Sequence, residues 1–167
     1  MSKNTDTIYA LSTPQGKSAI AVIRVSGKNV LKIIRKIAKI KNIIPNKTNL
    51  LFLKNKNAII DQTLVIYFKS PNSFTGEDVV EIYCHGGFAV IDKISKTLEK
   101  NDVRQAEPGE FTKRALLNDK IDLVKTESIS DIINAETEKQ RILAIKNLSG
   151  GLSEFTTKIN QKISSNL

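Results

Sequence analysis

The chain has 167 residues, with 26 Lys and Arg against 17 Asp and Glu, a formal charge of +9. This length fits one domain or one domain with a small appendage, and 40% hydrophobic with 26% charged residues excludes a disordered or fibrous chain. No apolar run approaches the ~20 residues of a membrane span, and the polar start has no signal-type apolar core. A single cysteine excludes an internal disulfide framework. We therefore expect a cytoplasmic protein with no membrane partner.

The positive charge is unevenly distributed along the chain. Residues 1–60 contain 12 basic residues and 1 acidic residue, whereas residues 61–167 contain 14 basic and 16 acidic residues. Such asymmetry is typical of a patch that attracts polyanions. However, Lys outnumbers Arg by 21 to 5, and arginine is the stronger ligand for phosphate. The pattern leaves two interpretations open, a solvated lysine-rich surface and a nucleic-acid-binding surface.

The first two thirds of the chain predict a mixed α/β domain. Short β-branched and apolar runs bounded by Gly, Pro and polar turns predict strands at 8–10, 19–25, 49–54, 63–68, 79–84 and, briefly, from 103. Apolar residues at helical spacing predict helices over 30–40 and 88–98. Ser26 is predicted to cap the first of these helices.

After Pro108 the pattern becomes helical. One helix is predicted around Phe111, and a second over 123–133. Asp122 is the predicted N-cap of the second helix, whose face extends toward Thr137. A third helix is predicted over 142–148 and a fourth over 152–163. About 45 residues past Asp122 are few for an independent core. We therefore expect these helices to pack on structure that the chain does not supply.

Glu81 is the first candidate for ligand binding. It is the only charged residue of the predicted strand 79–84 and shares a face with Val79 and Tyr83. A carboxylate on a half-buried face costs free energy unless it is paired or bound to a ligand. Glu81 therefore either recognises a ligand or faces solvent or a nearby lysine.

Three further residues carry possible chemistry. Arg24 lies in the apolar run 19–25, where it either holds a carboxylate through a bidentate pair or is an edge-strand or salt-bridging arginine. His85, the only histidine, lacks partners at metal-ligand spacing, which favours a structural or hydrogen-bonding role over a metal site. Cys84 ends an apolar run and is predicted to be buried and unreactive. We predict no catalytic residue and no metal site.

Nucleotide-binding motifs are absent from the sequence. Gly16-Lys17-Ser18 matches only the last three positions of a P-loop, because Leu11 stands where the first glycine belongs. The segment from Asn118 to Asp122 does not have the spacing of a guanine-recognition motif. The chain alone is therefore not expected to hydrolyse nucleotides.

Three blocks of residues occur in order between residue 6 and about residue 133. The first block contains DTIYA at 6–10, Thr-Pro at 13–14 and IRVSG at 23–27. The second contains PNSFTGED at 71–78, Glu81 and HGG at 85–87. The third contains PGEFT at 108–112, RA at 114–115, LNDK at 117–120 and DL at 122–123. Together they resemble the N-terminal part of the tRNA-modification GTPase MnmE (TrmE) family.

The resemblance implies an α+β folate-binding domain of the glycine-cleavage T-protein-like type over residues 1–120, followed by the first helices of an incomplete helical domain over 121–167. In the family this domain homodimerises and holds a tetrahydrofolate derivative, of the 5-formyl or methylene type, near the dimer interface. Its folate contacts carry over to Arg24, Glu81 and Lys120. A carboxylate suits the pterin N–H groups, and Arg or Lys suits the carboxylates of the glutamyl tail.

The family also has a Ras-like GTPase domain inserted in its helical domain and a C-terminal cysteine motif, both missing here. With an MnmG-type FAD protein it installs a carboxymethylaminomethyl-type group on the wobble uridine of tRNA. GTP is therefore expected as a partner only where a GTPase domain is supplied elsewhere, as for a truncated or split gene. Two alternatives stay open, a dimerisation or docking fragment without cofactor and a basic tRNA-binding module.

Overall fold

The computed structural model describes residues 6–150, which belong to two compact units. The first unit ends at Arg114 and the second begins at Ala115. The helix expected over 152–163 lies outside the described residues. Among residues 6–150, no helix is both long and apolar enough to cross a membrane.

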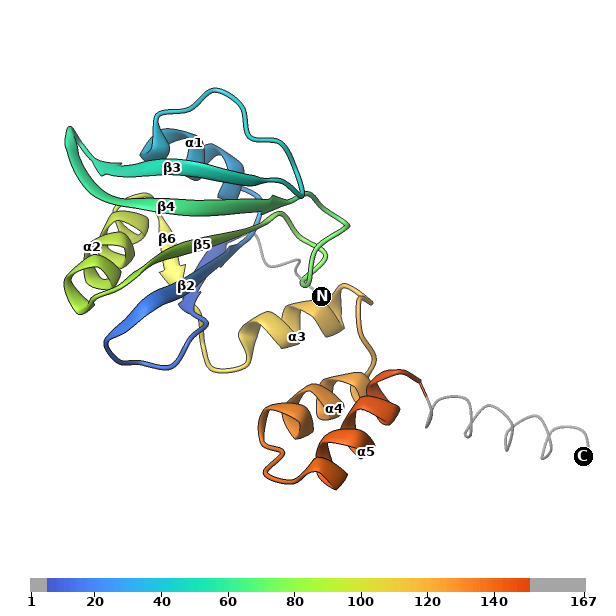
Figure 1. Ribbon diagram of the computed structural model, residues 1–167. Coiled ribbons are helices and arrows are strands. Elements are labelled where there is room, and N and C mark those ends of the chain that lie inside the picture. The colour runs from blue at the N-terminus through green and yellow to red at the C-terminus, as the bar shows by residue number, and fades with distance from the viewer. Residues whose placement is uncertain (1–5, 151–167) are drawn as a thin grey trace, which may run out of the picture. The chain divides into compact units, whose positions relative to one another are not determined.

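The first unit is built on a mixed six-stranded sheet with the strand order β3-β4-β5-β2-β1-β6 (Figure 1). Only β1 and β6 pair in parallel, and the other neighbours are antiparallel. The strands are β1 (Thr7–Leu11), β2 (Ser18–Ser26), β3 (Thr48–Asn55), β4 (Ala58–Phe68), β5 (Val79–Gly86) and β6 (Val103–Gln105). The predicted mixed α/β class and its six strands are confirmed.

Two helices, α1 (Val30–Ala38) and α2 (Phe88–Glu99), share one hydrophobic core with the sheet. Along β5 the core takes Val80, Ile82 and Cys84, which alternate with Glu81 and Tyr83. Since successive side chains of a strand point to opposite faces, Glu81 and Tyr83 lie on the face turned away from this core. The pleat therefore places the candidate carboxylate opposite both helices.

The predicted cap of α1 is wrong. Its N-cap is Asn29, which makes no side-chain capping bond. The Ser26 hydroxyl instead donates to Glu77 Oε2 over 2.7 Å and pairs with the Thr75 hydroxyl over 2.7 Å. Ser26 is the last residue of β2 and is fully buried, so its hydroxyl is used by a tertiary contact.

Gly86 is required by a close approach of β2 and β5. A Cβ added at Gly86 would collide with the Ser18 hydroxyl and lie 2.6 Å from the Ser18 carbonyl oxygen. The Gly86→Ala variant should therefore lose about 1–3 kcal/mol of unfolding free energy, measured by urea denaturation. Gly16→Ala is the control, because no atom lies within 4 Å of its added Cβ. Equal stability of the two variants would contradict this account of the strand contact.

The second unit contains α4 (Leu123–Ile133) and α5 (Glu138–Leu148), and its boundary with the first falls inside α3 (Glu110–Leu117). Asp122 caps α4 as predicted, accepting a hydrogen bond from the Lys125 amide. Thr137 does not continue α4. It is the N-cap of α5, in a capping box with Gln140.

Candidate functional site

Arg24 and Glu81 form the centre of the candidate site. They lie directly opposite each other in the register of β2 and β5. Arg24 donates from Nε and Nη2 to Glu81 Oε1 over 3.0 and 2.7 Å. The two side chains are 28% and 15% exposed, so the pair is reachable from solvent.

This pairing decides between the open interpretations of both residues. β2 lies between β5 and β1, so Arg24 is not an edge-strand residue. Glu81 pairs with this arginine rather than with a lysine. The salt-bridging interpretation of Arg24 is therefore confirmed, and its partner is Glu81, the other predicted site residue on the sheet.

Three aromatic side chains surround the pair. The Tyr83 hydroxyl donates to Glu81 Oε2 over 2.8 Å, and this bond is the main cause that raises the Tyr83 pKa. The Arg24 guanidinium carbon lies 5.3 Å from the ring centroid of Phe74 and 5.9 Å from that of Phe111. Both distances fall within cation–π range. The rings and the carboxylate together hold the guanidinium in place.

The pair keeps some hydrogen-bonding capacity for a ligand. A carboxylate has about four acceptor sites, and Glu81 uses two for Arg24 and one for Tyr83. Arg24 Nη1 has no hydrogen-bond partner among residues 6–150. The site therefore offers one acceptor and an adjacent cationic donor, a combination suited to a ligand that carries both N–H groups and oxygen acceptors.

Lys120, the third predicted site residue, belongs to the second unit. It is exposed and follows Asp119, which adopts the left-handed conformation with φ 55°. The Lys120 amide donates to the Ala115 carbonyl over 2.9 Å and closes the end of α3. The structure brings Arg24 and Glu81 together in the first unit, whereas Lys120 lies in the second unit.

His85 and Cys84 have the environments that the sequence indicates. The His85 ring Nδ1 and the Asp61 carboxylate are 2.8 Å apart, and the His85 amide donates to the same carboxylate over 2.8 Å. Cys84 is 3% exposed, and burial raises the pKa of its thiol to about 11. Residues 6–150 contain no cluster of three His, Cys, Asp or Glu side chains that could hold a metal ion.

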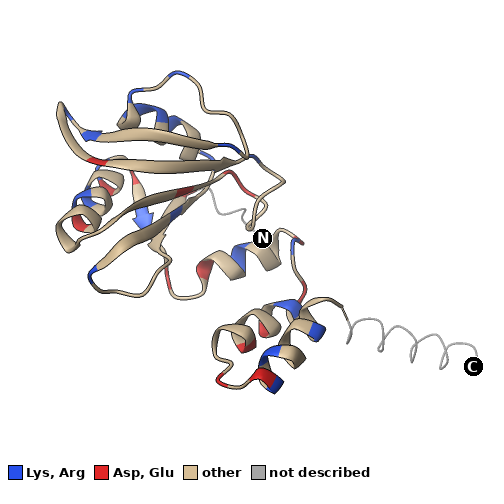
Figure 2. Ribbon diagram, viewed as in Figure 1, with Lys and Arg blue, Asp and Glu red and all other residues tan. Residues whose placement is uncertain are grey.

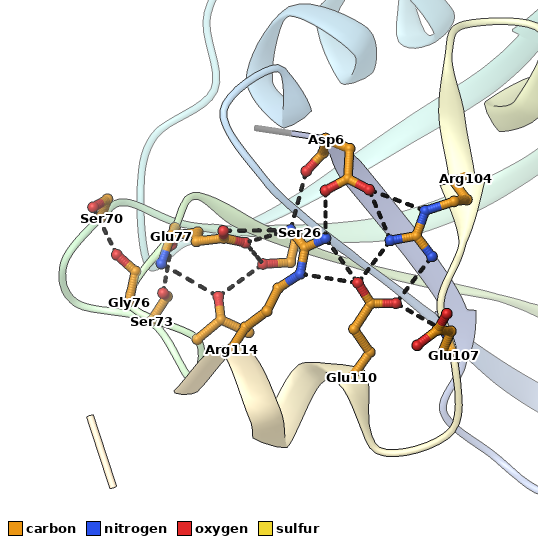
Figure 3. Close-up of polar contacts among 11 residues, drawn as sticks. Asp6, Ser26, Ser70, Ser73, Gly76, Glu77, Arg104, Glu107, Glu110 and Arg114 are labelled. Carbon is orange, nitrogen blue, oxygen red and sulfur yellow. Dashed lines mark hydrogen bonds and ion pairs between the residues drawn. The ribbon is translucent and has the colours of Figure 1, made fainter. Parts of the chain in front are cut away.

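Sequence reasoning missed a buried ionic network centred on Arg114 (Figure 3). The Arg114 side chain is 2% exposed and contacts three carboxylates, those of Asp6, Glu77 and Glu110. Arg104 joins the network by binding Asp6 and Glu110, each through Nη2 over 2.7 Å. The only sequence signal was that these four residues, Asp6, Glu77, Glu110 and Arg114, stand inside the three family-like blocks.

The pKa values of the acidic members reflect this environment. Hydrogen bonds from Arg104, reinforced by the Glu107 amide and Arg114, outweigh burial and lower the Glu110 pKa to about 2. Burial acts to raise the Asp6 pKa, but its bonds to Arg104 and Arg114 lower it overall. Both groups are therefore ionised near neutral pH, where they serve as structural anions.

The network also fixes the loop that carries Phe74. Arg114 Nη1 binds the Glu77 carboxylate, which accepts the Ser26 hydroxyl as well. Asp78 accepts hydrogen bonds from the Tyr67 hydroxyl and the Ser70 amide over 3.0 and 2.9 Å. The loop between β4 and β5 is thus anchored at its end, and Phe74 is held beside Arg24.

Comparison with known proteins identifies the family. Residues 7–120 match the family described as GTP-binding protein TrmE N-terminus. Three relatives are named "tRNA modification GTPase MnmE". The one from Lactococcus lactis subsp. cremoris is 42% identical over 98% of this chain, and the one from Thermotoga petrophila is 43% identical over 95%. The one from Fervidobacterium nodosum is 53% identical over 90% of this chain. The matches cover 36%, 35% and 34% of those proteins, so the chain spans about a third of their length. The chain therefore belongs to the TrmE N-terminus family, as the N-terminal part of a tRNA modification GTPase MnmE.

Proposed function

We propose that the chain is a folate-binding, homodimerising module, with a T-protein-like fold, of a tRNA wobble-uridine modification GTPase. The observation that carries this proposal is the solvent-reachable Arg24–Glu81 pair, flanked by Phe74 and Phe111. A reduced folate has a pterin with adjacent N–H donors and a tail with carboxylates. It therefore needs a carboxylate acceptor and a cation within one site.

Folate binding would rearrange the pair. Two parallel hydrogen bonds from the pterin need one acceptor site on each oxygen of Glu81, but Oε1 already accepts two bonds from Arg24. One Arg24 bond must therefore be exchanged for a pterin bond, which releases a guanidinium donor toward oxygen atoms of the ligand. Lys120 is proposed as a further cationic contact, toward the glutamyl carboxylates.

Calorimetric titration of the full chain with 5-formyltetrahydrofolate tests the proposal. Glu81→Gln should weaken binding by about tenfold to a hundredfold, since hydrogen bonds to charged groups contribute about 1.5–3 kcal/mol. The matched control is Glu99→Gln, because Glu99 also accepts a hydrogen bond from a tyrosine, Tyr9, over 2.7 Å. Absence of saturable binding by the parent protein, or equal weakening in both variants, would refute the proposal.

The relatives are named as tRNA modification GTPases, and this name supports tRNA as a partner. We propose a second copy of the chain, tRNA and an MnmG-type FAD protein as partners of the complete system. The P-loop is missing from the sequence, so GTP would be bound only by a GTPase domain outside residues 1–167. Location in the cytoplasm is part of the same proposal.

A further inference from the structure

A long stretch of the first unit carries only positive charge. Residues 7–60 contain no Asp or Glu, but they contain nine lysines and two arginines. In Figure 2 blue segments mark α1 and the loop that connects it to β3, with no red between them. The excess of positive charge in the sequence therefore includes a continuous segment, α1 and the loop that follows it.

Helix α1 presents lysines outward. Its buried residues are Val30, Ile33, Ile34, Ile37 and Ala38, whereas Lys32, Lys36 and Lys39 are exposed. From Lys32 to Lys39 the helix rises by about 10 Å. Lys39, the C-cap of α1, donates to the side chain of Asn57 over 3.1 Å, which joins this row to the turn between β3 and β4.

These cations have no neutralising partner within the part of the chain that the structure describes. None of the nine lysines at 7–60 forms an ion pair with any residue of the range 6–150. By contrast, Lys96 on α2 pairs with Asp92. A surface of uncompensated lysines attracts polyanions and releases their condensed counterions on contact.

We propose that the exposed lysines of α1 and its C-cap, Lys32, Lys36 and Lys39, form a docking surface for the phosphate backbone of RNA. The choice of RNA rests on the proposed function, in which the substrate is tRNA. The range 28–47 contains no aromatic residue that could stack on a base. These lysines would therefore contact the phosphates of the RNA without selecting a base sequence. A membrane is the poorer occupant, because the apolar residues of α1 face the core instead of remaining free for lipid.

The test is fluorescence anisotropy of labelled tRNA with the full chain between 50 and 200 mM salt. The triple variant Lys32→Gln/Lys36→Gln/Lys39→Gln should reduce the slope of log affinity against log salt by roughly 2–3. Its affinity at 50 mM salt should fall at least about tenfold. The matched control, Lys93→Gln/Lys96→Gln/Lys100→Gln, removes the same charge from exposed positions of α2 and its C-cap and should change the slope by less than about 1.

Equal losses in the two triple variants would overturn the proposal, as would a parent affinity that does not depend on salt. Binding to phosphatidylserine vesicles that excess tRNA cannot displace would assign the surface to membranes instead. Titration with 5-formyltetrahydrofolate should give the same affinity for the α1 triple variant and the parent. If the parent binds no folate but the triple variant weakens tRNA binding as expected, the proposed cofactor is refuted and the RNA surface is supported. If the parent binds folate but the triple variant does not weaken tRNA binding, the RNA surface is refuted and the proposed cofactor is supported.

Discussion

Replacing Arg114 with methionine is expected to lower the free energy of unfolding by about 3–5 kcal/mol, the usual cost of removing one partner from a buried ionic group. Methionine fills much of the same volume but leaves Asp6, Glu77 and Glu110 without their shared cation. Arg104 still compensates Asp6 and Glu110. Glu77 keeps the hydrogen bond from the Ser26 hydroxyl but loses its ion pair with Arg114, so the loss should be largest there.

Urea denaturation of the parent and the variant measures this loss. Arg141→Met is the matched control, because Arg141 forms an ion pair with Glu138 in which both side chains are more than half exposed. Such a pair contributes about 0–1 kcal/mol. A second change, Glu110→Gln, in the Arg114→Met background should cost less than it does in the parent, since the two groups are in contact. Additive losses would mean that the network does not act as a unit.

The strands and helices of the first unit were predictable because each carries its own local signal. The short apolar run of β5 and the helical period of α1 depend on neighbouring residues alone. The start of β4 was missed by five residues. Its first residues, from Ala58 to Gln62, include Asp61, a poor strand former. The structure uses that carboxylate to bind His85, a partner 24 residues away.

The candidate site could be predicted only in part, for the same reason. Arg24 and Glu81 each stood out as a charge in an apolar strand, yet no local pattern states that they lie opposite each other. Their contact depends on the register of β2 and β5. The ring of Phe111 beside Arg24 comes from a segment 87 residues later in the chain. Arg114 gave no signal of burial, because an arginine in a helix is ordinarily solvated. The cost of burying its charge is offset by Glu110, four residues earlier in the same helix, and by two carboxylates from distant segments, Asp6 and Glu77.

The second large effect is a loss of stability in acid caused by Glu110. Its pKa is about 2 in the folded protein, against an ordinary value of 4.5. The unfolded chain therefore takes up a proton first as the pH falls. Glu110 contributes its full stabilisation above pH 4.5 and loses it progressively as the pH falls toward 2. The difference of about 2.5 pKa units corresponds to about 3 kcal/mol, of which about 2 kcal/mol is lost between pH 6 and pH 3.

Urea denaturation of the parent and Glu110→Gln at several pH values isolates this contribution, because the other carboxylates titrate in both proteins. The stability difference should shrink by about 2 kcal/mol between pH 6 and pH 3. Glu138→Gln removes an exposed carboxylate that also pairs with an arginine. Arg141 lowers the Glu138 pKa as well, but solvent screens an exposed pair, so the difference of this variant from the parent should change much less with pH. A constant difference for Glu110→Gln would mean that Glu110 has an ordinary pKa. The network would then hold the loop and α3 together by shape and neutral hydrogen bonds, not by charge.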